Sequence, residues 1–437
     1  MHATFGRSPD SKISSHHRRL ALLSAFACLL VLATPFAAAD PRIPLTIAAA
    51  EDLALRDEPG LLELYSRADA LRDRAVAAGE LPDPMLRVGV ANYPIEGGDF
   101  STEGMTQAQL GYRQVFPRRA VRESKAGRLE HLAADSHASA EARERAVLLA
   151  TRESWLESYY WQQAIAVLTE SRPLFEDLVS VTRSLYSVGR KSQFDVLQAE
   201  LELQRLDDRL IAASRSLSAS RARLAQWLGD DASRPVASAL PDWPRSLELQ
   251  SLQNGLMNHP LLDAASARVD AQQSAVDLAE ASKKAGWALD LGYGYREGSL
   301  PSGEPRSDFV SVAVTFDLPF FQADRQDREL AAALAEHTAA RESKRKLLAE
   351  LSSQLLAQHA SWTDLSRRID LYEADILNMS AASADAALLA YQSDAGDFAD
   401  VLRSAVSNLN TRLDYIRLQV EHAKSYAALA NLGGLPR

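Results

Sequence analysis

A duplication constrains the fold of this chain more than any other feature. Residues 186–197 (YSVGRKSQFDVL) return 205 positions later as residues 391–402 (YQSDAGDFADVL), with Tyr, Asp, Val and Leu at matching places. Solenoid units are much shorter, roughly 20–50 residues, so this chain uses one large unit twice. The same offset relates three residues of the following segment to three near the C-terminus: Leu224, Ala225 and Gly229 to Leu429, Ala430 and Gly434.

Residues 1–39 have the pattern of a secretory signal peptide. Basic residues up to Arg19 precede an apolar run over residues 20–31, and three alanines stand just before Asp40. The alternative is a membrane anchor, which the pattern disfavours because the run is short for a bilayer and soon meets Pro35. The only cysteine, Cys28, lies inside this leader. It lacks the Leu or Val expected three residues before a lipidated cysteine, so lipidation is not expected. The mature chain would then contain no cysteine, which suits an oxidising compartment.

Charge and motif content argue against several classes of function. The net charge is −10, and removal of the basic leader makes the remainder more acidic, so nucleic-acid binding is not expected. Phosphate-binding loops, nucleophile elbows and zinc-protease motifs are absent from the sequence, so we expect neither an enzyme nor a cofactor. His131 and His137 are six residues apart on a predicted helix and so point in different directions, and His337 and His359 stand alone, so no resident metal site is expected either.

Long helices dominate the pattern. Residues 321–395 contain no Gly or Pro, and apolar residues recur there at a spacing of three and four, which is typical of a coiled coil. A matching helix is expected over residues 118–186, with a kink at Pro173, and shorter return helices over 190–228 and 397–432. The coiled-coil seam comprises Leu348, Leu351, Leu355, Trp362, Leu365, Ile369, Tyr372, Ile376 and Met379.

Two further helices are expected over residues 60–78 and 260–285. Stacked end to end with the return helices, they would match the length of each long helix. Residues 230–258, which contain three prolines, separate the two repeats as a linker or a small equatorial segment, and no structure is assigned to them.

Two runs with alternating apolar and polar residues precede each long helix. They cover residues 85–93 and 105–115 in the first repeat and 288–296 and 309–318 in the second. Their length suits tilted strands that cross a bilayer, although half-buried strands of a soluble domain would alternate in the same way. Four strands cannot close a barrel with a lumen, whereas three chains would supply twelve. The candidates for lipid-facing residues are Leu110, Tyr112, Leu291, Tyr293, Val310, Val312 and Val314.

With these features the chain resembles the TolC family of outer-membrane efflux proteins. The resemblance covers a first repeat at residues 40–229, the linker 230–258 and a second repeat at 259–437. It implies a mainly α-helical homotrimer, in which a periplasmic helical tunnel joins a shared twelve-stranded β-barrel in outer-membrane lipid. It also implies a periplasmic adaptor protein and an inner-membrane pump of the RND type as partners. The motifs that carry it are YSVG at 186–189, DVL at 195–197, Ala199, and NHP at 258–260.

Two segments resemble the heavy-metal cation efflux branch of this family. They are LPDP at 81–84, leading into ANYP at 91–94, and LPFF at 318–321, followed by DRQDRE at 324–329. Metal cations are therefore the expected cargo, and a drug-efflux or type I secretion duct of the same fold is the alternative. A periplasmic helical-hairpin adaptor would be a different class, but adaptors contain one hairpin where this chain has two.

The second turn carries several aspartates that would form carboxylate rings in a trimer. The alternative is that Asp simply caps the helix that follows. The glycines of the two turns do not align, because the 205-residue offset places Gly189 on Asp394, so the two turns need not share a backbone shape. The resemblance points to a gate, and the candidates for this periplasmic gate are Tyr391, Asp397, Asp400, Arg403, Asp195, Gly189 and Gly396.

Overall fold

The computed structural model describes residues 43–244 and 246–435. Contacts between residues divide the chain into Met1–Ile43 and Pro44–Arg437, and the second unit contains all the elements named below. The expected signal peptide at residues 1–39 lies outside the described residues.

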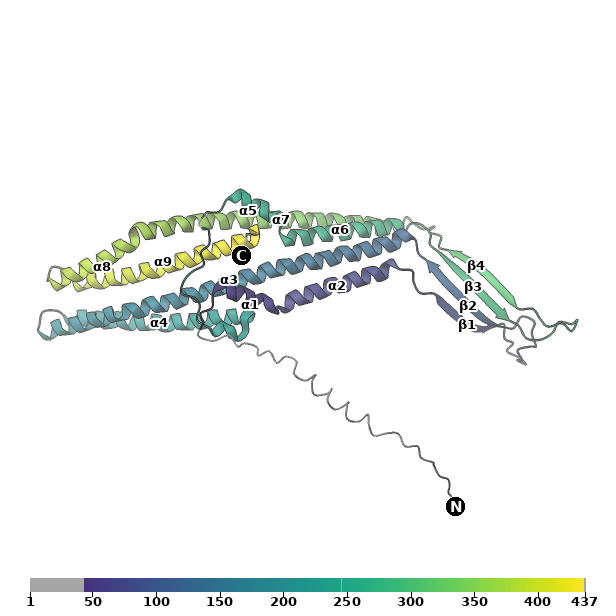
Figure 1. The fold of residues 1–437 in the computed structure, drawn as a ribbon, viewed down its shortest axis with the longest axis horizontal. Coiled ribbons are helices and arrows are strands. Elements are labelled where there is room, and N and C mark those ends of the chain that lie inside the picture. The colour runs from purple at the N-terminus through teal and green to yellow at the C-terminus, as the bar shows by residue number, and fades with distance from the viewer. Residues whose placement is uncertain (1–42, 245, 436–437) are drawn as a thin grey trace, which may run out of the picture. The chain divides into compact units, whose positions relative to one another are not determined.

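Each repeat is built around one long helical path. In the first, α3 (Arg119–Ser187) packs against α2 (Pro59–Gly79) over one part of its length and against α4 (Gln193–Leu228) over another (Figure 1). The two shorter helices are therefore stacked along one long helix, and α3 continues through Pro173. The second repeat comprises α6 (Pro260–Ala281), α7 (Gln326–Leu371), a π-helical segment (Tyr372–Ile376), α8 (Leu377–Gln392) and α9 (Phe398–Gly433).

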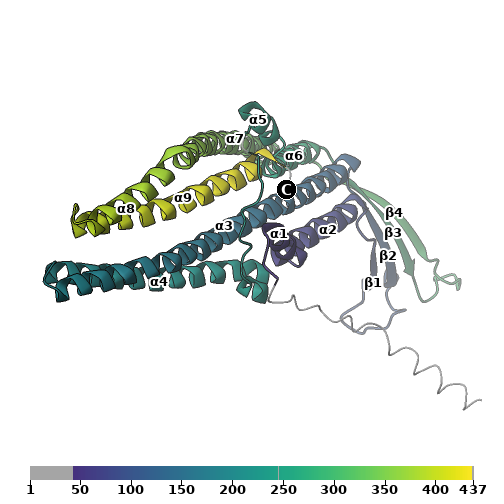
Figure 2. The same cartoon turned by 60° about the vertical axis from the view of Figure 1, so that its left-hand side comes forward.

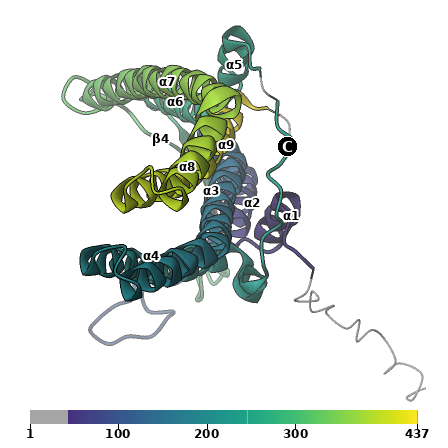
Figure 3. The ribbon, with the colours of Figure 1, turned by 90° about the vertical axis from the view of Figure 1, so that its left-hand side faces the viewer.

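The two repeats lie side by side within the second unit. Helix α3 packs against α6 and α9 of the other repeat. Figure 2 shows the hairpins α3/α4 and α8/α9 running in the same direction towards their turns. Viewed along the helices, α7, α8, α3 and α4 follow a curve, with α1 (Ile47–Arg56) and α5 (Leu249–Leu256) on its outer side (Figure 3).

The four strands form one antiparallel sheet in the order β1-β2-β3-β4. Strand β2 of the first repeat pairs with β3 of the second, so the sheet joins the two repeats. The outer strands β1 and β4 each have one edge without a partner strand among the described residues. Their bounds are β1 Met85–Ala91, β2 Gln107–Phe116, β3 Trp287–Tyr295 and β4 Phe309–Phe316.

The segment between the repeats packs on the middle of α3. Leu45 and Val236 form a parallel bridge, and the Trp155 indole N–H donates to the Leu45 carbonyl at 2.8 Å. Gln162 binds both backbone groups of Val236, donating to its carbonyl and accepting from its N–H. The short helix η1 (Gly229–Ser233) and α5 belong to this part of the chain. Helix α1, which lies near the N-terminal end of the first repeat and which the sequence pattern did not predict, also packs against α3.

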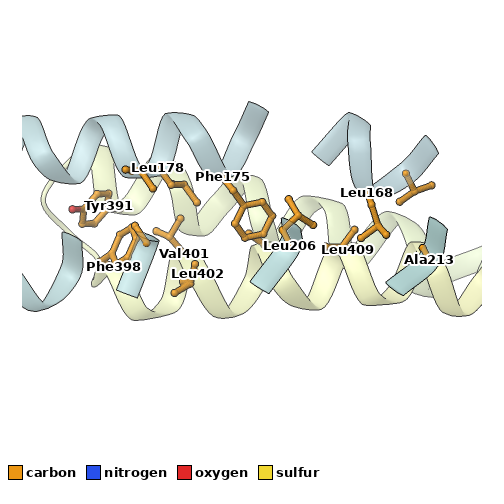
Figure 4. Close-up of a cluster of buried hydrophobic side chains, with 14 residues drawn as sticks. Leu168, Phe175, Leu178, Leu206, Ala213, Tyr391, Phe398, Val401, Leu402 and Leu409 are labelled. Atoms are coloured by element: carbon orange, nitrogen blue, oxygen red, sulfur yellow. The ribbon is translucent and has the colours of Figure 1, made fainter. Parts of the chain in front are cut away.

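The hydrophobic core near the turns joins four helices. Leu178 and Phe175 of α3, Leu206 of α4, Tyr391 of α8, and Phe398 and Leu409 of α9 belong to one buried cluster (Figure 4). Burial of these apolar side chains is the main stabilising term that holds the two hairpins together.

The expected seam is correct over the first half of the second long helix and wrong near its end. Leu351, Leu355 and Trp362 are buried, whereas Met379 is 69% exposed. The cause is the π-helical segment Tyr372–Ile376. A π turn contains one residue more than an α turn. After this segment, the residues that face the neighbouring helix are therefore shifted by one position along the sequence. Accordingly, the Ser380 hydroxyl contacts the Asn408 side chain of α9 at 3.1 Å.

Candidate functional site: the paired turns and the two faces of the sheet

The two turns have the same backbone shape, although only one has glycine at the critical position. Gly189 has φ 75° and Asp394, its equivalent, has φ 62°. The N–H groups of these residues donate to the carbonyls of Tyr186 and Tyr391 at 2.9 and 3.2 Å. Aspartate tolerates this left-handed conformation better than most residues. Glycine is therefore not required at this position.

Gly396 has a different role from Gly189. Its φ is not in the left-handed region, but a Cβ there would lie 3.0 Å from the Cβ of Ala390. The glycine lets the chain entering α9 approach the end of α8 closely.

An ion pair links the two turns within one chain. Asp394 lies 3.3 Å from the guanidinium of Arg190 and 3.4 Å from the ammonium of Lys191. These contacts, the hydrogen bond from Lys191 first, hold the pKa of Asp394 below its usual value. The ammonium of Lys191 also lies 4.8 Å from the ring centre of Tyr391. The sequence revealed the acidic cluster but not these cationic partners.

Tyr391 is buried, whereas its equivalent in the first repeat is not. Tyr391 is 2% exposed and packs against Phe398, while Tyr186 is 48% exposed. Figure 4 shows Tyr391 at one end of the buried cluster. Its hydroxyl has no hydrogen-bond partner among the described residues. Burial raises its pKa, and the negative charges of Asp195 and Asp394 raise it further.

The remaining candidates from the turns serve two different local purposes. Asp195 forms a capping box with Ser192 at the start of α4. In the second repeat, Asp397 occupies the capping position but makes no such side-chain bond. The equivalent of Asp195 is Asp400, and its carboxylate instead accepts from Arg403 at 2.9 Å. Asp195 therefore serves as a helix cap, whereas Asp400, at the equivalent position of α9, forms an exposed ion pair with Arg403.

One face of the sheet is apolar. Directly opposed residues in an antiparallel sheet lie on the same face, and the register aligns Tyr112, Leu291 and Val312 in one row. The next row contains Leu110, Tyr293 and Val310, and Val314 lies on the same side of β4. All seven candidate residues therefore share a face, and all are exposed in the single chain.

The opposite face is polar and lined by small residues. It forms a hollow of about 700 Å³, whose lining includes Arg87, Gln109, Asp290 and Ser311. Gly292 lies on this face, where a Cβ would meet the Ser311 hydroxyl at 2.4 Å.

The described residues offer neither a metal-binding cluster nor a membrane-spanning helix. In that part of the chain, no group of three or more His, Cys, Asp or Glu side chains could hold a metal ion. None of the helices among residues 43–244 and 246–435 is long and apolar enough to cross a membrane.

Comparison with known proteins places this geometry in a fold family. No protein-family model matches the chain. The outer-membrane channel OprN superposes with a TM-score of 0.74 over 89% of this chain and 90% of its own, at 17% identity. The outer-membrane protein VceC from Vibrio cholerae superposes with a TM-score of 0.74 over 89% and 96%, at 18% identity. The chain has the fold of the TolC-family outer-membrane channels.

Two curated relatives share sequence with this TolC-fold chain. The cobalt-zinc-cadmium resistance protein CzcC of Cupriavidus metallidurans is 23% identical over 381 residues, covering 85% of this chain and 86% of CzcC. The protein CyaE of Bordetella pertussis is 28% identical over 192 residues, covering 42% of this chain and only 40% of CyaE. The likeness to CzcC thus extends over most of the TolC fold, whereas the likeness to CyaE covers less than half.

Proposed function

We propose that the protein is the outer-membrane channel of a tripartite efflux system and acts as a passive exit duct. The observation that carries this proposal is the sheet, which has one apolar face and, in the described part of the chain, two edges without a partner strand. An open sheet cannot lie in lipid, because its edges would leave backbone groups unpaired. Three copies would close twelve strands into one barrel with the apolar face towards lipid. The helices of the three chains would then form a tunnel in the periplasm.

The partners follow from this arrangement. The turns at Gly189 and Asp394 stand at the end of the helical hairpins remote from the sheet. A periplasmic adaptor would contact this end and connect it to an inner-membrane pump of the RND type. The protein itself performs no reaction in this scheme, because the pump supplies the energy.

The proposed cargo is a metal cation. The support is the match to CzcC, whose name describes cobalt, zinc and cadmium resistance and whose likeness to this chain extends over most of both proteins. Organic drugs or a secreted polypeptide would be the cargo of another duct with the same fold.

The gate would lie at the two turns. Asp397 and Asp400, with Arg403 beside them, would surround the pore axis in three copies, and carboxylate rings of this kind attract multivalent cations. Tyr391, buried at the same end of the hairpins, would hold them together through its ring. We expect Asp400→Ala to weaken block by multivalent cations added from the periplasmic side. Unchanged block in this variant would assign Asp400 to the pair with Arg403 alone.

The duct can be tested on the purified protein. The expected result is recovery from the outer-membrane fraction as a trimer that dissociates on heating in a denaturing gel and forms channels in planar bilayers. Recovery as a water-soluble monomer without channel activity would contradict the proposal.

The cargo needs a separate experiment. A deletion strain should become more sensitive to cobalt, zinc or cadmium, and expression of the wild-type chain should restore resistance. Unchanged sensitivity to these metals, together with a changed response to organic drugs, would reject metal cations as the cargo and leave the duct intact.

A further inference from the structure

The polar face of the sheet carries an unbalanced positive charge. By register, its charged residues are Arg87 of β1, Arg113 of β2 and Asp290 of β3. Arg113 lies 3.7 Å from Asp290, and Asp290 also accepts from the Thr315 hydroxyl at 3.2 Å. The aspartate is therefore engaged by its own neighbours, and the face retains a net charge of about one positive unit per chain at neutral pH.

Arg87 supplies this charge, and the residues beside it leave it accessible. Its side chain is exposed, and no ion pair or hydrogen bond engages it among the described residues. The register aligns Arg87 with Gly111, Gly292 and Ser311 in one row across all four strands. A Cβ at Gly111 would lie 3.5 Å from the Cβ of Arg87, so the two residues are direct neighbours on this face.

The small residues of this row explain the hollow in the polar face. Two glycines and a serine occupy the positions where larger side chains would fill the space above the sheet. Arg87 therefore borders an open volume of about 700 Å³, which Gln109, Ser311 and the already paired Asp290 also line. Arg87, Gln109 and Ser311 carry hydrogen-bonding groups that suit an anion or an anionic group of a larger molecule.

We propose that Arg87 is a selectivity-determining residue and that three copies form a ring that favours anions inside the barrel. This rests on the proposed function, because the ring exists only if three sheets close with their polar faces inward. Rings of Arg or Lys select anions in pores, as rings of carboxylates select cations. A metal would then pass this ring more readily in a complex with anionic ligands than as a bare divalent cation.

The acidic residues of the outer loops act at a separate level of the barrel. Glu96, Asp99 and Glu103 lie in the loop after β1, beyond Ala91. Arg87 is four residues before that strand end, which corresponds to roughly 13 Å along the strand. The Debye length at 0.1 M salt is about 10 Å, so salt largely screens the interaction between these carboxylates and the ring. The carboxylates therefore only partly offset the positive charge of the ring. The ring is therefore expected to influence permeation at physiological salt.

The experiment is a reversal-potential measurement on the trimer in planar bilayers under a potassium chloride gradient. Arg87→Gln should lower the chloride-to-potassium permeability ratio by at least about twofold, because clefts of one sign concentrate counter-ions. Arg87→Lys should keep the ratio near that of the wild type. Ser311→Asp, which adds a carboxylate to the same row, should lower it as Arg87→Gln does.

The control is Arg74→Gln, which removes an exposed arginine of α2 away from the sheet and should leave the ratio unchanged. Equal ratios in the wild type, Arg87→Gln and Ser311→Asp would overturn the inference while the channels themselves still support the duct. Failure of the wild-type protein to form channels would instead contradict the proposed function and, with it, the ring.

Discussion

Asp394 and Lys191 lie in different repeats, and their side chains are 3.4 Å apart. This contact, together with Arg190, connects the turn of one hairpin to the turn of the other. If the periplasmic end opens by separation of the hairpins, the contact must break. The link is exposed and should therefore be weak enough to yield when a partner binds.

Asp394→Asn removes the charge of this link and keeps a residue that tolerates the left-handed backbone. We expect larger single-channel conductance in planar bilayers, with unchanged trimer stability. The exposed Asp208 of α4 offers a control, since Asp208→Asn should not change conductance. In the wild type the pKa of Asp394 is lowered, so the link should persist at neutral pH and be lost only as the pH falls through that lowered value. Equal conductance in the wild type and Asp394→Asn would show that the link does not restrict the turns.

Tyr391 contributes to the core through its ring, because its hydroxyl is buried without a partner in the described chain. We expect Tyr391→Phe to leave the free energy of unfolding unchanged or to raise it by about 1 kcal/mol. Tyr391→Ala should lower it by about 3–5 kcal/mol through loss of the buried ring. Urea unfolding followed by circular dichroism would measure both, and a large loss in Tyr391→Phe would reveal a hydrogen bond supplied by a neighbouring chain.

The two faces of the sheet should respond differently to a new arginine. Val312→Arg places a charge on the apolar face and should cost about 2–4 kcal/mol if the residue lies near the middle of the bilayer. Ser311→Arg, on the adjacent residue and the opposite face, should assemble normally. The yield of heat-modifiable trimer in the membrane fraction compares the two, and equal yields would contradict a lipid-facing role for the apolar face.

The π-helical segment predicts a contrast between two residues of the second long helix. Leu355 is 1% exposed and Met379 is 69% exposed. Leu355→Ala should lower the free energy of unfolding by about 2–5 kcal/mol, whereas Met379→Ala should change it by less than about 0.5 kcal/mol. Urea unfolding of detergent-solubilised protein would measure both. Similar losses would mean that Met379 packs against a neighbouring chain in the trimer.

Glu157 of α3 lies 3.1 Å from Arg417 and 2.6 Å from Lys424 of α9. Burial raises the pKa of Glu157, but hydrogen bonds from the two cations outweigh this effect and lower it. Its contribution to stability is therefore present above the unfolded-state pKa, about 4.3, and is lost as the pH falls through the folded-state value. Glu157→Gln should cost about 1–3 kcal/mol at pH 7, and the difference should shrink in acid.

Glu153, one helical turn away, provides a control because its pKa is shifted in the opposite direction to that of Glu157. Burial raises its pKa, with Lys424 lowering it and Glu421 raising it. Its negative charge is therefore unfavourable at neutral pH, and the penalty disappears as the pH falls through the raised value. Because the residue is only partly buried and keeps access to solvent, Glu153→Gln should leave stability at pH 7 unchanged or raise it by less than about 0.5 kcal/mol. A loss as large as that of Glu157→Gln would contradict this assignment of the two carboxylates.

Local patterns in the sequence indicate the long helices and the strands, but they missed α1 and α5. Apolar spacing and the absence of Gly and Pro reflect which side of a helix is buried, and alternation reflects which side of a strand is apolar, so both can be read from neighbouring residues. The duplication showed that Asp394 corresponds to Gly189. It could not show that the two residues share a left-handed backbone, because that depends on hydrogen bonds formed by the whole turn.

Long-range contacts were decided only by the tertiary structure. The pairing of β2 with β3 and the ion pair between Asp394 and Lys191 involve residues far apart in the chain. The lack of an ion-pair partner for Arg87 among the described residues likewise depends on what the fold places beside it. The π-helical segment also escaped prediction, because a single extra residue in one turn leaves no distinct local pattern but rotates every side chain after it. The sequence by itself therefore determined the long helices, the strands and their order, and the packing between the repeats decided which charges remain available for function.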